Sequence, residues 1–268
     1  MILKPVRPGT TLPLSDRDAK RPRELKDKDA LKALLADEVK ALGKLQDRLW
    51  AEKRHAVLVI LQGRDASGKD GSIKQVFDGC NPQGCRVASF GVPTPLELSH
   101  DFLWRIHSAV PPRGIIGIFN RSHYEDVVAV RVKRLAPANV WRARYEQINN
   151  FEKMLTENGV TILKFFLHIS RAEQRARLID RLEDPEENWK FRVGDLDDRR
   201  RWGAFTAAYR DAIRLCTTQW APWYMVPADS KTVRNYLITR TLNRTLRGLR
   251  LRYPKASREV LALKRSII

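Results

Sequence analysis

The chain has 268 residues, of which 43% are hydrophobic, so it can bury one sizeable core. Its formal charge of +19 comes from 50 Lys and Arg against 31 Asp and Glu, which indicates a polyanionic partner such as nucleic acid, a membrane surface or a phosphate polymer. No apolar run has transmembrane length, the start lacks the apolar stretch of a secretory signal, and three cysteines are too few for a disulfide framework. These features exclude a membrane protein and predict a soluble cytoplasmic one.

The N-terminal region divides into an arm and the start of a core. Four prolines among mixed charges over residues 1–30 favour an extended arm that wraps the body or contacts another subunit. Leucines at helical spacing predict a long amphipathic helix from Leu31 to about Arg54. We therefore predict one domain over residues 31–268 behind the arm.

Apolar runs alternate with helical patterns along the rest of the chain. The run Ala56–Leu61 is typical of a strand buried on both faces of a parallel sheet. Similar runs follow at Val87–Phe90, Ile115–Phe119, Val160–Leu167 and Tyr224–Val226. This alternation predicts an α/β fold with a doubly wound parallel sheet flanked by helices, in which ligands bind beyond the carboxyl ends of the strands.

A glycine-rich segment follows the first predicted strand and matches the pattern G-x-x-x-x-G-K. Placed between a buried strand and a helix, such a turn aims backbone N–H groups and the helix dipole at an anion, and the lysine adds a point charge. An ordinary glycine-rich turn is the alternative. We predict that phosphate or nucleotide contacts come from Gly63, Ala66, Ser67, Gly68, Lys69, Asp70 and Gly71, and farther along the chain from Lys74, Asn120, Arg177 and Asp195.

The loop departs from the usual phosphate-loop motif at the residue after the lysine. A Ser or Thr that binds magnesium normally stands there, whereas this chain has Asp70. The metal must then be held differently, and the carboxylate of Asp65 is a suitable hard oxygen ligand. The alternative for Asp65 is a turn residue that caps its own backbone.

A second polar cluster follows the run Ile115–Phe119. A strand in this place usually ends in Asp, but here it ends in Asn120, so a nearby carboxylate has to substitute. Ser122 and Glu125 have capping-box spacing, which gives Glu125 a structural role and leaves Asp126 as the better metal ligand.

Two further side chains of this cluster could take part in chemistry. Arg121 lies between the strand end and the next helix, where a guanidinium can grip phosphate oxygens at two points. His123 could act as a general base, but we favour a surface or hydrogen-bonded histidine.

Together these segments resemble the second family of polyphosphate kinases, small P-loop enzymes with a thymidylate-kinase-like core. The resemblance runs from about Leu34 to Leu249, and its carriers are LQGRDASGKDGSIK, LSHDFLWRIH, FNRSHYEDV, LHISRAEQRARLIDRLEDPEENWKF and APWYMVPAD. Asn120 followed by the pair Glu125-Asp126 is similar to the branch that phosphorylates both nucleoside mono- and diphosphates.

The resemblance implies a P-loop kinase fold with a helical lid over about residues 171–202. It implies that Asp65 and Asp126 hold Mg²⁺, with Mn²⁺ as an alternative, while Lys69 and Arg121 contact the phosphates that are exchanged. Arg177 and Arg181 share one helix face, and we expect Arg181 and Asp195 to act in the lid, although a solvated charged helix is the alternative. The family forms homo-oligomers, so a dimer or tetramer is expected.

The predicted activity is transfer of the terminal phosphoryl group of inorganic polyphosphate to AMP or ADP, or to GMP or GDP. Such a polymer has no base to stack, so we expect a groove of Lys and Arg, with Lys74 as one member. The lack of interleaved aromatics disfavours nucleic acid as the partner. An ATP-dependent nucleotide kinase and a non-catalytic polyanion-binding protein remain as alternatives.

Overall fold

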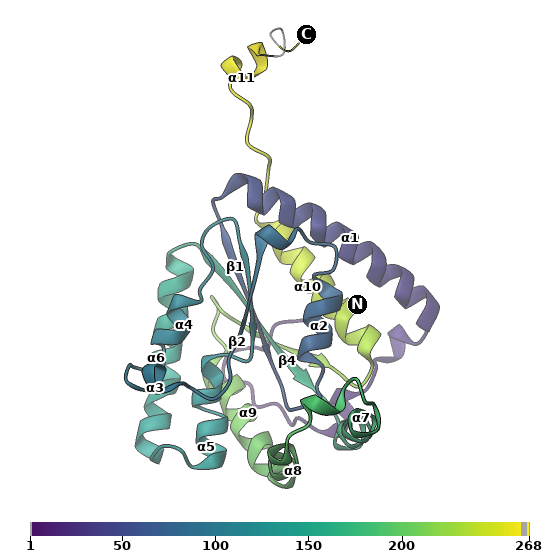
Figure 1. The fold of residues 1–268 in the computed structure, drawn as a ribbon, viewed down its shortest axis with the longest axis vertical. Coiled ribbons are helices and arrows are strands. Elements are labelled where there is room, and N and C mark those ends of the chain that lie inside the picture. Colours follow the sequence, from purple (N-terminus) through teal and green to yellow (C-terminus); the bar gives the residue numbers. More distant parts are fainter. Residues whose placement is uncertain (1, 264–266, 268) are drawn as a thin grey trace.

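The computed structural model describes residues 2–263 and 267, and its centre is a five-stranded parallel sheet of order β2-β3-β1-β4-β5 (Figure 1). Its strands are β1 (Ala56–Gln62), β2 (Cys85–Ser89), β3 (Ile116–Asn120), β4 (Val160–His168) and β5 (Trp223–Pro227). The predicted doubly wound P-loop kinase fold is confirmed. Because β1 connects to β2 on one side and β3 connects to β4 on the other, the topological switch point lies between β1 and β3.

Helices cover both faces of the sheet (Figure 1). The odd-numbered residues of β1 share a core with one set of helices and the even-numbered residues share a core with another, as alternation along a strand requires. The first set is α1 (Lys28–Glu52), α2 (Lys69–Val76) and α10 (Lys231–Gly248). The second face carries α4 (Trp104–Ser108), α6 (Ala138–Glu157) and α9 (Trp202–Cys216).

One strand differs from the buried run that the sequence predicts. β2 lies at the edge of the sheet, and the side chain of Val87 is 54% exposed. The remaining helices are short or belong to the region predicted as the lid: α3 (Pro95–Leu98), α5 (Ala129–Lys133), α7 (Arg171–Glu183), α8 (Val193–Arg200) and α11 (Arg258–Ala262). Over the part of the chain that the structure describes, no helix is both long and apolar enough to cross a bilayer.

The N-terminal arm runs along the opposite edge of the sheet. The Val6 N–H donates to the Trp223 carbonyl of β5 at 2.8 Å, and the Asp229 N–H donates to the Ala19 carbonyl at 3.1 Å. His168 Nε2 lies within hydrogen-bond distance of the Ser15 carbonyl oxygen, at 2.8 Å. The arm therefore occupies backbone groups that an edge strand would otherwise expose.

Gly43 of α1 packs directly against the backbone of the segment that follows α2. A Cβ atom at residue 43 would lie 2.1 Å from the backbone oxygen of Gly79. We expect Gly43→Ala to lower the free energy of unfolding by about 1–3 kcal/mol, because the added Cβ clashes with the backbone that follows α2 and forces α1 away from it. Denaturant unfolding measures this loss. The control is Gly203→Ala in α9, where no atom lies within 4 Å of the added Cβ, and equal losses in both variants would contradict the explanation.

Candidate active site

Two loops begin side by side at the switch point of the sheet. Leu61 of β1 is the register partner of Asn120 at the end of β3. The chain leaves β1 into the glycine-rich loop over residues 63–69 and leaves β3 into residues 121–126. The fold therefore brings together the two clusters that the sequence analysis selected.

The glycine-rich loop curls around its own lysine. Lys69 Nζ donates to the Gly63 carbonyl at 2.9 Å and to the Arg64 carbonyl at 3.2 Å, and the side chain is buried. Ala66 has φ +60° and Gly68 has φ +93°, so the chain passes twice through the left-handed region before α2 begins. Burial and the nearby charge of Arg121 lower the pKa of Lys69, although Asp65 and Glu125 oppose them.

Asp65 and Arg121 join the two loops directly. Arg121 Nη2 lies 2.8 Å from Asp65 Oδ1, and Arg121 itself has φ +63°. Burial favours the neutral carboxyl of Asp65, but the charges of Lys69, Arg121 and Lys133 outweigh it and hold the pKa below its usual range. The ionised carboxylate is thus held beside the lysine of the loop.

The two residues that depart from the usual motif bond to each other. Asn120 Nδ2 donates to Asp70 Oδ1 at 2.6 Å, across the gap between β3 and the start of α2. Asp70 is exposed, and this contact ties its carboxylate to the neighbouring strand. The aspartate after the lysine therefore joins the start of α2 to the end of β3.

The capping-box interpretation of Glu125 is wrong. Residues His123–Asp126 form a 3₁₀ turn, and the hydroxyl of Ser122 accepts from the Tyr124 N–H at 3.2 Å instead of from Glu125. Glu125 lines the cavity between the loops, where burial raises its pKa while Arg121 and Lys69 attract its charge. The sequence analysis did not select Glu125 as a site residue, because its spacing from Ser122 fits a capping box.

Asp126 lines the same cavity but points to different cations. Arg144 Nη1 lies 3.0 Å from Asp126 Oδ1, and Arg105 Nη2 lies 4.0 Å from Oδ2. Burial raises the pKa of Asp126, and the two arginines oppose that change. The structure thus places two carboxylates, Asp65 and Glu125, near the lysine of the loop, and places Asp126 in a separate ion-paired cluster on the cavity wall.

The cavity between the loops has a volume of about 160 Å³ and is closed on one side by α9. Phe205 and Tyr209 of this helix line it, and so does Arg64, whose guanidinium carbon lies 4.0 Å from the centre of the Trp202 ring. Burial lowers the pKa of Arg64 to about 10. The sequence carried no signal for these contacts, because α9 is distant from the loop along the chain.

The predicted lid residues have unequal roles. Arg177 Nη1 donates to the Ala66 carbonyl at 3.0 Å, and Nη2 donates to the carbonyls of Ala228 and Asp229 at 2.7 and 2.8 Å. Arg177 therefore supports the loop from behind. Arg181 Nη1 lies 4.0 Å from Asp195 Oδ2, and this pair joins α7 to α8.

A metal ion would need ligands beyond these side chains. In the described residues no group of three or more His, Cys, Asp or Glu side chains is arranged to hold a metal. Magnesium in kinases is usually bound by one or two carboxylates together with substrate phosphates and water. The hard oxygens of Asp65 and Glu125, beside a phosphate loop, fit that kind of site.

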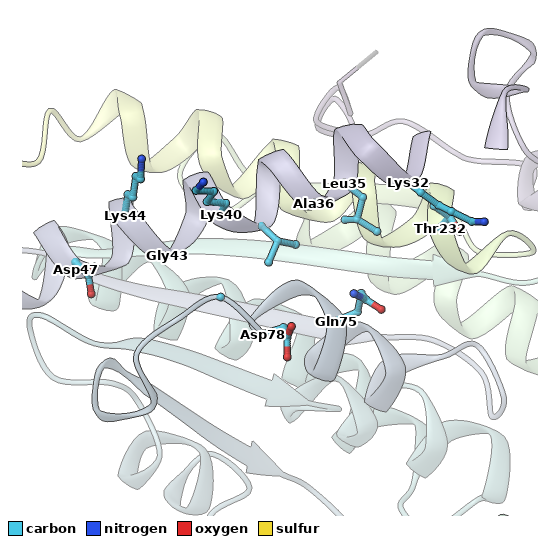
Figure 2. Close-up of a pocket in the computed structure, with 12 residues that line it drawn as sticks. Lys32, Leu35, Ala36, Lys40, Gly43, Lys44, Asp47, Gln75, Asp78 and Thr232 are labelled. Atoms are coloured by element: carbon cyan, nitrogen blue, oxygen red, sulfur yellow. The ribbon is translucent and has the colours of Figure 1, made fainter. Parts of the chain in front are cut away.

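A larger groove, of about 720 Å³, lies between α1 and α2 (Figure 2). It contains none of the predicted site residues. Lys32, Lys40 and Lys44 border it, but all three are exposed and Asp47 and Asp78 share its wall. The cavity at the switch point has the buried charges that chemistry requires, whereas this groove does not.

A buried polar cluster anchors the loop over residues 121–126. His123 Nε2 lies 3.2 Å from Glu152 Oε1, and Lys164 Nζ contacts Glu152 Oε2 at 2.5 Å and Tyr124 Oη at 2.8 Å. All four side chains are fully buried. His123 is therefore the hydrogen-bonded histidine that we favoured, and Glu125 and Asp126 extend from a turn that α6 and β4 hold in place.

A family model described as Polyphosphate kinase 2 (PPK2) matches residues 25–253. The chain belongs to the polyphosphate kinase 2 family. It is 58% identical over 214 residues to an AMP/ADP-polyphosphate phosphotransferase of Meiothermus ruber, and the alignment covers 80% of each chain. It is 41% identical to an ADP-polyphosphate phosphotransferase of Rhodopseudomonas palustris over 88% of this chain and 87% of that one.

Solved structures agree with this assignment. A crystal structure of Polyphosphate Kinase 2 from Arthrobacter aurescens TC1 superposes with a TM-score of 0.93 and 41% identity. The alignment covers 98% of this chain and 94% of that one. The polyphosphate kinase 2 fold therefore extends over almost the whole chain, including the arm and the region predicted as the lid.

Lys164→Met tests how the loop over residues 121–126 is anchored. The change leaves the carboxylate of Glu152 buried without its ammonium partner, so we expect a loss of about 3–5 kcal/mol in the free energy of unfolding. Denaturant unfolding measures it. The double variant Glu152→Leu with Lys164→Met removes both charges and should regain most of the stability. A double variant no more stable than Lys164→Met would contradict this account.

Proposed function

We propose that this protein is a kinase that transfers the terminal phosphoryl group of inorganic polyphosphate to a nucleoside mono- or diphosphate. The observation that carries the proposal is the meeting of Lys69, Arg121, Asp65 and Glu125 at the switch point of the sheet. The names of the M. ruber and R. palustris relatives supply the donor and the adenine acceptors. A guanine acceptor stays a prediction.

The chemistry needs no covalent enzyme intermediate. The terminal phosphate oxygen of the acceptor attacks the end phosphorus of the polymer, a new P–O bond forms, and the bridging P–O bond breaks with its electron pair on the shortened polymer. Both reactants are anionic at pH 7, so the protein chiefly positions them and offsets their repulsion. We assign Lys69 and Arg121 to the phosphates near the bond that breaks.

We assign the metal site to the carboxylates of the cavity. Asp65 and Asp126 remain the predicted Mg²⁺ ligands, with Mn²⁺ as an alternative, and Glu125 joins them as a third candidate because it faces Lys69 and Arg121. When bound, the ion neutralises charge on the transferring group. Asp126 Oδ1 pairs with Arg144, so a metal ion would share this carboxylate with the arginine or displace it.

The remaining assignments concern the lid, the donor groove and the assembly. We propose that Arg181 and Asp195 act when α7 and α8 approach the substrates, because their pair lies beside the phosphate loop and Asp65 contributes to the pKa of Asp195, which burial chiefly raises. Lys74, exposed on α2, is a candidate for the donor groove. A dimer or tetramer and a cytoplasmic location stay predictions.

One assay tests the proposed function. Purified protein is incubated with Mg²⁺, ADP and polyphosphate, and ATP is measured over time, with AMP as acceptor in a parallel series. We expect ATP or ADP to form. A run in which ATP replaces polyphosphate tests the ATP-dependent kinase, which would phosphorylate AMP without the polymer, and absence of product in every run would support the non-catalytic alternative.

Asp65→Asn separates the chemistry from the fold. It keeps the size of the side chain and removes the charge beside Lys69, so we expect kcat to fall by at least about 100-fold. Thermal unfolding should show a folded protein. Asp47→Asn, which neutralises an exposed aspartate in the groove of Figure 2, is the matched control and should keep its activity. Near-normal turnover in Asp65→Asn would overturn the assignment.

A further inference from the structure

Arg234 of α10 is buried directly behind the phosphate loop. Its residue exposure is 2%, and Nη1 donates to the Ser67 carbonyl at 3.2 Å. A Cβ atom at residue 68 would lie 1.9 Å from Nη1, so Gly68 is the residue that lets the guanidinium approach the loop backbone. No sequence motif pointed to this arginine, which lies over 160 residues from the loop along the chain.

The contact fixes the direction of one peptide unit. In a trans peptide the C=O and N–H groups point in opposite directions. Arg234 holds the Ser67 carbonyl on the outer side of the loop, so the Gly68 N–H of the same peptide faces the other way. The Ser67 N–H already donates to the Arg64 carbonyl at 3.1 Å, whereas within the described residues no acceptor takes the Gly68 N–H. That N–H is therefore available to an anion.

The charge of Arg234 has no carboxylate to offset it. Among the residues that the structure describes, none forms an ion pair with Arg234, and its other bond is from Nε to Asn235 Oδ1 at 3.1 Å. Burial and the repulsion of Arg177 lower its pKa to about 9. Nη2 also lies 3.5 Å from a Cβ built on Gly71, in the first turn of α2, where the helix dipole disfavours a cation.

We propose that Arg234 is a positioning residue for the donor, which holds the Gly68 N–H toward the bound polyphosphate and adds positive charge that the polymer end neutralises. This inference rests on the proposed function, in which the loop binds that end. Three features that are unfavourable in the protein alone become favourable with a polyanion in the loop: deep burial, no carboxylate partner, and a position at the positive end of a helix.

A different role would be support of the fold alone. Asn235 Oδ1 also accepts from Ser72 Oγ at 3.1 Å, so the Arg234-Asn235 pair links α10 to α2. A residue with only this role would change stability and affect donor and acceptor alike. A residue that serves the donor would change donor affinity selectively, and this difference decides between the two roles.

The test compares Arg234→Gln, Arg234→Lys and the control Arg240→Gln. Gln keeps an N–H donor for the Ser67 carbonyl but removes the charge, and Lys keeps the charge. Arg240 lies on the same helix and pairs with Glu38 at 3.1 Å, away from the loop, so its change removes one positive charge from the protein without touching the site. The measurements are tripolyphosphate affinity by titration calorimetry, the KM for polyphosphate and for ADP, kcat, and thermal unfolding.

For Arg234→Gln we expect tripolyphosphate binding to weaken and the KM for polyphosphate to rise, each by about tenfold, with the KM for ADP within about twofold of wild type. Arg234→Lys should stay within about threefold of wild type for the donor, and Arg240→Gln should match wild type. Donor binding by Arg234→Gln equal to wild type would overturn the inference while leaving the proposed function intact.

Two other outcomes are also decisive. If Arg234→Gln does not fold, Arg234→Lys carries the test, and a loss of donor and acceptor affinity in equal measure there would overturn the inference in favour of structural support. If wild-type protein itself binds no tripolyphosphate, the proposed function fails first and the inference fails with it.

Discussion

Buried positive charge around the phosphate loop is the constraint on which the rest of the structure depends. Arg64, Lys69 and Arg234 are all buried, and within the described part of the chain none of them forms an ion pair with a carboxylate. Burial lowers the pKa of each, because it disfavours the charged form. In the proposed function a bound polyanion would supply the missing partner, and the unfavourable burial in the free protein would become affinity for substrate.

The sheet gives this charge a defined place. The two loops meet because β1 and β3 are neighbours, and contacts from several elements then fix them. Arg177 and Arg234 hold loop carbonyls from behind, and Gln174 Nε2 donates to the Asp65 carbonyl at 3.0 Å. The region predicted as the lid joins the same network, because Arg199 Nη1 of α8 lies 2.9 Å from Gln174 Oε1 of α7. A movement of α7 and α8, if they form the predicted lid, would therefore act on the backbone of the phosphate loop.

Much of the fold could be predicted from the sequence because its signals are local. The buried run Ala56–Leu61 and the glycine pattern after it define β1 and the loop without tertiary information, and the polar residues after β3 are equally visible. The sequence analysis selected both Asp65 and Arg121, but it did not predict the contact between them. It depends on register between β1 and β3, which the sequence does not encode locally.

The sequence analysis did not identify several residues of the site, because their contacts involve elements that lie far apart along the chain. Glu125 was assigned to a cap because its spacing from Ser122 fits one, and only the 3₁₀ geometry of the turn shows that its side chain enters the cavity. Arg234 and Tyr209 lie on helices remote from the loop, and in the sequence they read as ordinary helix residues. Lys164 lies within the predicted strand run Val160–Leu167, and its partner Glu152 lies on another element, α6.

Single-turnover transfer from polyphosphate labelled at its terminal phosphorus tests the central claim most directly. Enzyme in excess is mixed with the labelled polymer, Mg²⁺ and ADP, quenched at millisecond intervals, and the label is followed in polymer, nucleotide and protein. Direct transfer at the switch-point cavity predicts that label appears in ATP at the rate at which it leaves the polymer. Label that passes through the protein, or that is released only as inorganic phosphate, would contradict the account.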